Sequence, residues 1–240
     1  MEAVILQDIW FGYRPDRATL RGVSLAVNAG EIVGLLGRNG AGKTTTFRIL
    51  TGLLRPERGS VIVGGFDAAS HRVEVQRRIA FMPTTPLLYE QLSAEENLNM
   101  FALLWGVEAA AANERSHRLL HEVGLWDVRH DWVESYSTGM KQRLSICVAI
   151  LLDPAVIVMD EPFNGLDIDG TLWAREMLQT LARSGKAILL SSHVPELIEA
   201  VAHTVAVLDD GRIVEQLPMV RVAQLGGLMK YFDLKARSCA

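Results

Sequence analysis

The chain has 240 residues, of which 49% are hydrophobic and 22% charged, and its formal net charge is -4. This usage is typical of one large globular α/β domain with a small insertion, and a negative balance without a Lys and Arg cluster argues against nucleic acid as a partner. No uninterrupted apolar stretch approaches the roughly 20 residues that span a bilayer, so we expect any membrane spans to come from another subunit.

The first part of the chain alternates short strand-like runs with turns. Residues 3–9 and 20–27 are β-like, and the second run alternates apolar and polar side chains as a half-exposed strand does. We expect these two runs to form an antiparallel region ahead of the main fold. Residues 31–36 are predicted to be a strand that ends in a glycine-rich loop, followed by a helix from residue 43 to about residue 53.

Turn residues dominate the next segment and surround a short predicted strand at 60–63. A helix around 72–78 then leads into a strand at 79–82, which should continue the sheet. From residue 93 onward the pattern predicts two helices, the first opened by Ser93 and Glu96 at the spacing of a capping box.

The second half returns to alternation. It predicts a helix at 138–152, a strand at 155–159, a helix near 171–182 and a strand at 187–190. Continuous apolar strands alternating with helices indicate a mainly parallel sheet covered on both faces. Together with the antiparallel region, this pattern predicts an α/β fold with a mainly parallel sheet flanked by helices.

The C-terminal part adds a hairpin and an amphipathic tail. Residues 204–208 and 212–215 flank an Asp-Asp-Gly turn, which is a hairpin signal. Residues 225–232 could cap the domain or contact a partner. Cys147 and Cys239 lie far apart without a metal-ligand spacing, and we expect Cys147 to be a small buried thiol in a chain suited to a reducing cytoplasm.

A phosphate-binding motif lies between the predicted strand at 31–36 and the following helix. Eight consecutive residues match G-x-x-x-x-G-K-[ST], namely Gly37, Arg38, Asn39, Gly40, Ala41, Gly42, Lys43 and Thr44. The glycines let backbone N–H groups surround phosphate oxygens, Lys43 reaches the β and γ phosphates, and Thr44 offers a hydroxyl to Mg²⁺. With Thr45, these residues are the predicted triphosphate contacts. They make the predicted α/β fold one with a phosphate-loop (P-loop) NTPase core.

Two acids follow the apolar strand at 155–159, at the carboxyl edge where ligands bind to parallel sheets. We expect Asp160 to hold Mg²⁺ through its water shell, and Glu161 to polarise the water that attacks the γ-phosphate. Acids after an apolar strand are often only a strand end, but the upstream phosphate loop favours a functional pair.

A third motif opens the predicted helix at 138–152, where Ser137 is well placed as the N-cap. Taken alone, it is a capped helix. The segment 136–143, Tyr-Ser-Thr-Gly-Met-Lys-Gln-Arg, resembles the signature sequence of ATP-binding cassette (ABC) proteins, whose usual core is Leu-Ser-Gly-Gly-Gln. Thr138 and Met140 depart from that core while Ser137 and Gly139 are kept, a variant that resembles those of cassettes serving small exporters.

The resemblance covers nearly the whole chain and implies further site residues. Tyr13 stands where the family stacks an aromatic ring on adenine, with Phe11 as an alternative. Residues 164–167, which end in Asp167, resemble the loop that touches the opposing phosphate site. His193 follows an apolar strand and resembles the switch histidine that contacts the γ-phosphate.

One position departs from the family pattern. A Gln normally follows the strand that corresponds to 79–82 and links Mg²⁺ to the helical subdomain, but Thr84 stands there. A threonine hydroxyl is shorter and would need a bridging water to reach the metal. We therefore expect slow coupling or slow hydrolysis and do not count Thr84 as an ordinary ligand.

The resemblance implies an ATPase that works as one half of a nucleotide-clamped dimer. ATP and Mg²⁺ would lie between the phosphate loop of one subunit and the Ser137-headed helix of the other, with Lys43, Glu161 and His193 as the catalytic residues. The second subunit would be another copy or a close relative. A separate membrane permease would hold the cytoplasmic pair at the inner face of the cell membrane and export an unspecified cargo.

The expected domain plan is one ABC ATPase domain with a catalytic core at 1–86 and 134–217, a helical subdomain at 87–133 and a tail at 218–240. Two other functions are weighed against transport. A soluble cassette protein acting on DNA or ribosomes would carry long coiled coils or a second cassette, and neither is present. A phosphate-loop kinase or GTPase would leave the signature segment and His193 unexplained.

Overall fold

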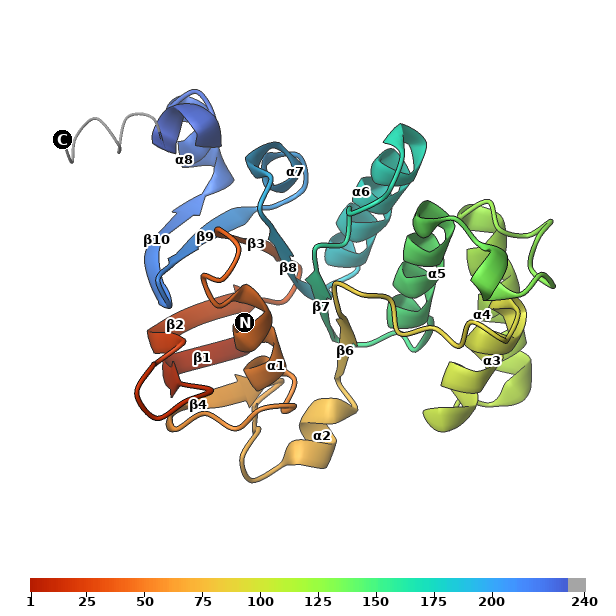
Figure 1. The fold of residues 1–240 in the computed structure, drawn as a ribbon, viewed down its shortest axis with the longest axis horizontal. Helices are drawn as coiled ribbons and strands as arrows, with labels where there is room; N and C mark the ends of the chain where they lie inside the picture. The colour runs from red at the N-terminus through yellow and green to blue at the C-terminus, as the bar shows by residue number, and fades with distance from the viewer. Residues whose placement is uncertain (233–240) are drawn as a thin grey trace.

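The computed structural model describes residues 1–232 and contains two β-sheets with helices around them (Figure 1). The first sheet has the order β2-β1-β4-β5 and is antiparallel throughout. Its strands are β1 (Glu2–Phe11), β2 (Leu20–Asn28), β4 (Arg58–Val63) and β5 (Phe66–Asp67). The predicted antiparallel region is therefore confirmed, and β4 extends it.

The second sheet has the order β10-β9-β3-β8-β7-β6, and every pair in it is parallel except the β9–β10 hairpin. Its strands are β3 (Ile32–Leu36), β6 (Ile79–Met82), β7 (Val156–Asp160), β8 (Ala187–Ser192), β9 (Thr204–Asp209) and β10 (Arg212–Pro218). The strands β3, β7 and β8 are buried along their whole length. Because parallel strands are covered on both faces, their sequences read as unbroken apolar runs.

Helices cover the two faces of the parallel sheet with separate cores. On one face α1 (Lys43–Leu50) packs between the two sheets, with Phe47 fully buried. On the other face lie α5 (Thr138–Leu151), α6 (Ile168–Arg183) and α7 (Pro195–Glu199). This layered arrangement is the predicted α/β fold with a mainly parallel sheet.

Two helices stand apart from the sheets and pack on α5 (Figure 1). They are α3 (Ala94–Leu104) and α4 (Ala109–Glu122), and the capping box of Ser93 and Glu96 is present at the start of α3. Their core includes Cys147 of α5, where burial raises the pKa of the thiol. The expected buried thiol is therefore confirmed, while Cys239 lies outside the described residues.

Tyr136 connects this helical region to the start of α5. Its hydroxyl donates a hydrogen bond of 2.7 Å to the carbonyl oxygen of Val128. Burial, with a smaller contribution from the charge of Asp131, raises the pKa of Tyr136 to about 12. The hydroxyl therefore stays protonated, and its hydrogen bond holds the start of the signature sequence against the segment that contains Val128.

Several boundaries differ from the sequence prediction. Helix α1 ends at Leu50 because Gly52 takes a left-handed φ of 71° two residues beyond it. Helix α6 begins at Ile168, three residues before the predicted start, since the Asp167 side chain caps it. The short elements α2 (Arg72–Gln76), α8 (Met219–Gln224) and a 3₁₀ turn (Val133–Ser135) are also present, and residues 228–232 are helical.

Candidate active site

An open pocket of about 510 Å³ lies at the carboxyl edge of the parallel sheet, beside the start of α1. It is formed by residues of the phosphate loop, the end of β7 and the segment after β8. Its lining consists of Tyr13, Thr19, Arg38, Asn39, Gly40, Gly42, Lys43, Thr44, Thr45, Thr84, Asp160, Glu161, Asn164 and His193. Most of the predicted ATP contacts are thus brought together by the fold.

The loop from β3 to α1 has its shape because two positions exclude a side chain. A Cβ atom at Gly37 would lie 2.5 Å from the carbonyl oxygen of Leu208, and Gly42 has a φ of 112°. Gly37 and Ala41 are not among the lining residues, and Ala41 is buried in the core between the sheets. The glycines therefore let the loop approach β9 while its outer residues line the pocket.

Lys43 is only 7% exposed although it carries a charge. Its Nζ donates a 2.7 Å hydrogen bond to the Gly37 carbonyl oxygen and lies 3.5 Å from Oε1 of Glu161. A buried ammonium requires such partners because its desolvation is costly. The loop and the acidic strand end thus hold the amine at the pocket wall.

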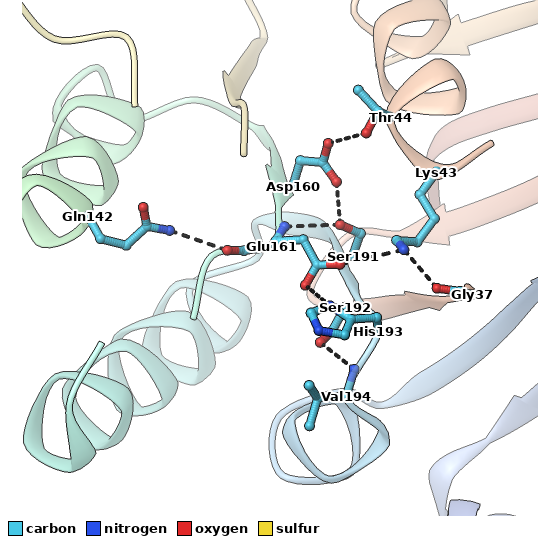
Figure 2. Close-up of polar contacts among 10 residues, drawn as sticks. All are labelled: Gly37, Lys43, Thr44, Gln142, Asp160, Glu161, Ser191, Ser192, His193 and Val194. Atoms are coloured by element: carbon cyan, nitrogen blue, oxygen red, sulfur yellow. Dashed lines mark hydrogen bonds and ion pairs between the residues drawn. The ribbon is translucent and has the colours of Figure 1, made fainter. Parts of the chain in front are cut away.

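The pair of residues predicted for the metal is already joined. The Thr44 hydroxyl donates to Oδ2 of Asp160 over 2.5 Å, and the Ser191 hydroxyl donates to the other oxygen, Oδ1, over 2.5 Å (Figure 2). A hydroxyl and a carboxylate are the hard oxygen donors that Mg²⁺ takes beside substrate phosphates. This donor set fits a magnesium ion bound together with a triphosphate.

Glu161 lies at the centre of the polar network in Figure 2. Its carboxylate contacts Lys43 through Oε1 and His193 Nδ1 through Oε2 at 3.0 Å, and it is nearly buried. Its backbone has a φ of 56°, which is uncommon outside glycine. The sequence analysis found Glu161 and His193 separately, and the fold joins them.

Tyr13 and Phe11, the two aromatic residues considered for the adenine contact, differ in their position relative to the pocket. Tyr13 is 55% exposed and lines the pocket, whereas Phe11 packs against the core and meets Tyr13 edge to face at 5.0 Å. The exposed ring of Tyr13 is the one available to a base. Thr84 also lines the pocket, as does Thr19, which the sequence analysis missed because no motif marks it.

The signature residues lie elsewhere. Within residues 1–232, neither Ser137 nor Gly139 lines the pocket, and Ser137 is exposed. The Ser137 hydroxyl accepts a hydrogen bond from the Met140 N–H over 3.2 Å, as an N-cap does. Asp167 also lies outside the lining and caps α6 while pairing with Arg143 at 2.5 Å. Ser137, Gly139 and Asp167 therefore lie outside the pocket of this chain.

Residues 20–164, more than half of the chain, match the protein family described as ABC transporter. The ABC transporter ATP-binding protein NatA of Bacillus subtilis (strain 168) is 38% identical over 196 residues, which cover 81% of this chain and 80% of NatA. The chain belongs to the ABC transporter family. It is an ATP-binding subunit of this family and an ATPase.

Two further similarities support this assignment to the ABC family. The daunorubicin resistance ATP-binding protein DrrA3 of Streptomyces coeruleorubidus is 34% identical across 84% of this chain and 64% of DrrA3. A solved structure of an ATP binding subunit of an ABC transporter has a TM-score of 0.88 and 33% identity, covering 97% of this chain and 99% of that one. Within residues 1–232 of this ABC ATPase, no helix has both the length and the apolar character that a membrane span requires.

Proposed function

We propose that this chain hydrolyses ATP as one half of a dimer and powers export through a separate membrane permease. The single observation that carries the dimer is the separation of the two nucleotide-binding motifs. The phosphate loop lines a pocket that is open on one side, while the signature helix begins at an exposed residue outside it. A second subunit can supply that helix to the open side.

The residues of the pocket have separate roles in the proposed reaction. Lys43 and the loop N–H groups bind the phosphates, and the exposed ring of Tyr13 stacks on the base. Glu161 accepts the proton of the attacking water, and His193, bonded to the same carboxylate, contacts the γ-phosphate. Thr44 and Asp160 would hold Mg²⁺, which supplies charge neutralisation to the phosphates.

The proposed dimer places Ser137 and Gly139 of one subunit against the γ-phosphate in the other. Helix α5 has 14 residues and starts at this point, so its N-terminus carries partial positive charge. Asp167, at the edge of the same surface, would face the opposing phosphate site. Loss of the γ-phosphate after hydrolysis would then weaken closure and open the pair.

The membrane partner is proposed to dock on the helical subdomain, which we place at residues 87–133. Helix α3 exposes large apolar side chains near its end, with Leu103 73% and Leu104 64% exposed. Exposed apolar groups of this kind mark interaction sites. The pair would then sit at the inner face of the cell membrane. A purified chain that binds ATP normally but is neither retained nor stimulated by any permease would contradict this assignment.

Export is favoured over other transport because the relatives include the daunorubicin resistance protein DrrA3. The alternative, a soluble ABC ATPase acting on nucleic acid or ribosomes, has less support. The described residues contain no long coiled coil, since their longest helix is the 16-residue α6. The relatives NatA and DrrA3 are also a transporter ATP-binding protein and a resistance ATP-binding protein.

The test is the substitution Glu161→Gln, which removes the proton acceptor and keeps the side-chain size. We expect turnover to fall by about 100-fold or more, ATP binding to persist, and an ATP-dependent dimer to accumulate in size-exclusion chromatography. Glu176→Gln, on the exposed side of α6 and outside the pocket, is the matched control. A monomer with unchanged hydrolysis would refute the proposal.

A further inference from the structure

The signature helix α5 is connected to the catalytic strand end through a buried side chain. Gln142 lies just over one turn after Ser137, but it points inward and is only 2% exposed. Its Nε2 donates to the carbonyl oxygen of Pro162 over 2.9 Å and to that of Glu161 over 3.3 Å. Figure 2 shows the amide reaching from α5 to the backbone of Glu161.

These bonds act on a backbone that needs support. Glu161 has a φ of 56°, a left-handed conformation that costs free energy for a residue with a Cβ atom. Such a conformation persists only when the surrounding groups hold it. The carbonyl oxygen of Glu161 is one of the groups that would move if the backbone relaxed to an ordinary conformation.

A second hydrogen bond holds the same residue from the opposite side. The N–H of Glu161 donates to the Ser191 hydroxyl over 3.0 Å, and that hydroxyl in turn donates to Asp160. The amide nitrogen of Glu161 is therefore bonded to β8, while its carbonyl oxygen accepts from Gln142 of α5 and also from the Asn164 N–H over 3.2 Å. Between them the two contacts fix the direction in which the carboxylate leaves the chain, toward Lys43 and His193.

The other contacts between α5 and the loop after β7 do not reach Glu161. Arg143 pairs with Asp167 at the exposed start of α6. A Cβ atom on Gly139 would lie 2.9 Å from the carbonyl oxygen of Gly165, so these two backbones pack closely, again beyond Glu161. Within residues 1–232, Gln142 is thus the side chain of α5 that is hydrogen-bonded to Glu161.

We propose that Gln142 is a positioning residue for ATP hydrolysis. Its amide holds the left-handed backbone of Glu161, so that the carboxylate of each subunit is aligned through the same helix that the subunit presents to its partner. The inference rests on the proposed role of Glu161 as the proton acceptor. It adds that the signature helix acts on its own subunit's carboxylate as well as on the partner's nucleotide.

The test is Gln142→Met, which keeps the length and bulk of the side chain but removes both N–H donors. We expect kcat to fall by about 10-fold to 100-fold, because displacement of a catalytic group by roughly 1 Å has an effect of that size. The dissociation constant for ATP should change by less than about twofold, since Gln142 does not line the pocket. A general loss of structure would change both.

Two variants guard this test against a folding defect. Ile146→Val removes one buried methyl group from the same helix and leaves the Gln142 amide in place, and it should keep the wild-type kcat. Gln142→Asn keeps the amide on a side chain one methylene shorter, and its kcat should lie between those of the wild type and Gln142→Met. If Gln142→Met does not fold, Gln142→Asn replaces it as the test. A partial or complete loss of kcat in Ile146→Val would overturn the proposal.

A double-mutant cycle separates the inference from the function on which it rests. If Gln142 acts through Glu161, the variant Glu161→Gln with Gln142→Met should hydrolyse ATP at the same residual rate as Glu161→Gln alone. A further fall in the double variant would mean that Gln142 acts elsewhere and would overturn the proposal. Wild-type turnover in Glu161→Gln would instead refute the proposed role of Glu161, and with it the basis of the inference.

Discussion

The phosphate-loop pocket and the signature end of α5 are built in opposite ways. In the pocket, Lys43, Asp160 and Glu161 are buried, and they are already paired: Lys43 with Glu161, and Asp160 with the Thr44 hydroxyl. At the signature end, Ser137 is exposed and its hydroxyl caps α5. In the pocket, contacts within the chain fix the functional side chains. At the signature end, the helix start is capped but stays exposed to solvent.

The two regions differ in what they require: fixed side-chain geometry in the pocket, and accessibility at the start of α5. Burial in the pocket costs desolvation energy, and the network of hydrogen bonds offsets that cost and fixes the geometry before nucleotide arrives. The exposed helix end needs only to be rigid and accessible. Changes in the pocket should therefore impair nucleotide binding by the single chain as well as turnover by the dimer, and changes at Ser137 should impair only what requires a second subunit.

Among the changes that test this contrast between the two regions, Lys43→Ala has the largest expected effect. Removal of the ammonium group leaves the triphosphate without its main cation, so we expect the affinity for ATP to fall by about 100-fold, or roughly 2.7 kcal/mol. Isothermal titration of the isolated chain with ATP measures this loss. Arg183→Ala, which removes an exposed cation from the end of α6, should leave the affinity unchanged. Equal affinity in Lys43→Ala and wild type would contradict the role given to the pocket.

A smaller effect, confined to the dimer, is expected from Ser137→Asp. An aspartate still caps the helix, but it places a negative charge where the partner's γ-phosphate would lie. We expect normal ATP affinity in the monomer, about 10-fold slower turnover, and no ATP-dependent dimer by light scattering in the Glu161→Gln background. Ser137→Thr keeps both hydroxyl and cap and serves as the control. Loss of ATP binding in the Ser137→Asp monomer would contradict the claim that Ser137 affects only steps that require a second subunit.

The smallest effect concerns Asp167, beside the signature end. Its hydrogen bonds with the Gly170 N–H and then with Arg143 hold the pKa of its carboxyl below the usual value. A lowered folded-state pKa means that the contribution to stability is present above the unfolded pKa of about 4 and is lost as the pH falls through the folded value. Asp167→Asn still caps α6, so it removes only the charge.

We therefore expect Asp167→Asn to lower the Tm by about 1–2 °C at neutral pH, since the ion pair is exposed. The urea-unfolding midpoints of variant and wild type should converge as the pH is lowered from about 7 toward about 3. A difference that grows on acidification would show that the carboxylate is not favoured in the folded state. Asp127→Asn, at an exposed residue of the α4–α5 connection, is a matched control.

The sequence by itself determined the elements and motifs whose signals are local. The apolar runs of β3, β7 and β8, the capping box at Ser93 and the phosphate-loop motif all depend on residues close together in the chain. Hydrophobic period, capping and glycine spacing act over a few residues, so they can be recognised without knowledge of the fold. The order of strand, loop and helix then indicated the α/β fold.

Only the tertiary structure decided which distant residues meet. No pattern along the chain reveals that Ser191 bridges Asp160 and the Glu161 backbone, that Thr19 lines the pocket, or that Gln142 reaches the Glu161 carbonyl. These contacts join segments that are far apart in sequence, and their geometry depends on how the helices pack on the sheet. Side-chain chemistry indicates which residues are candidates for the site. The distances and burial that let these residues act together result from packing.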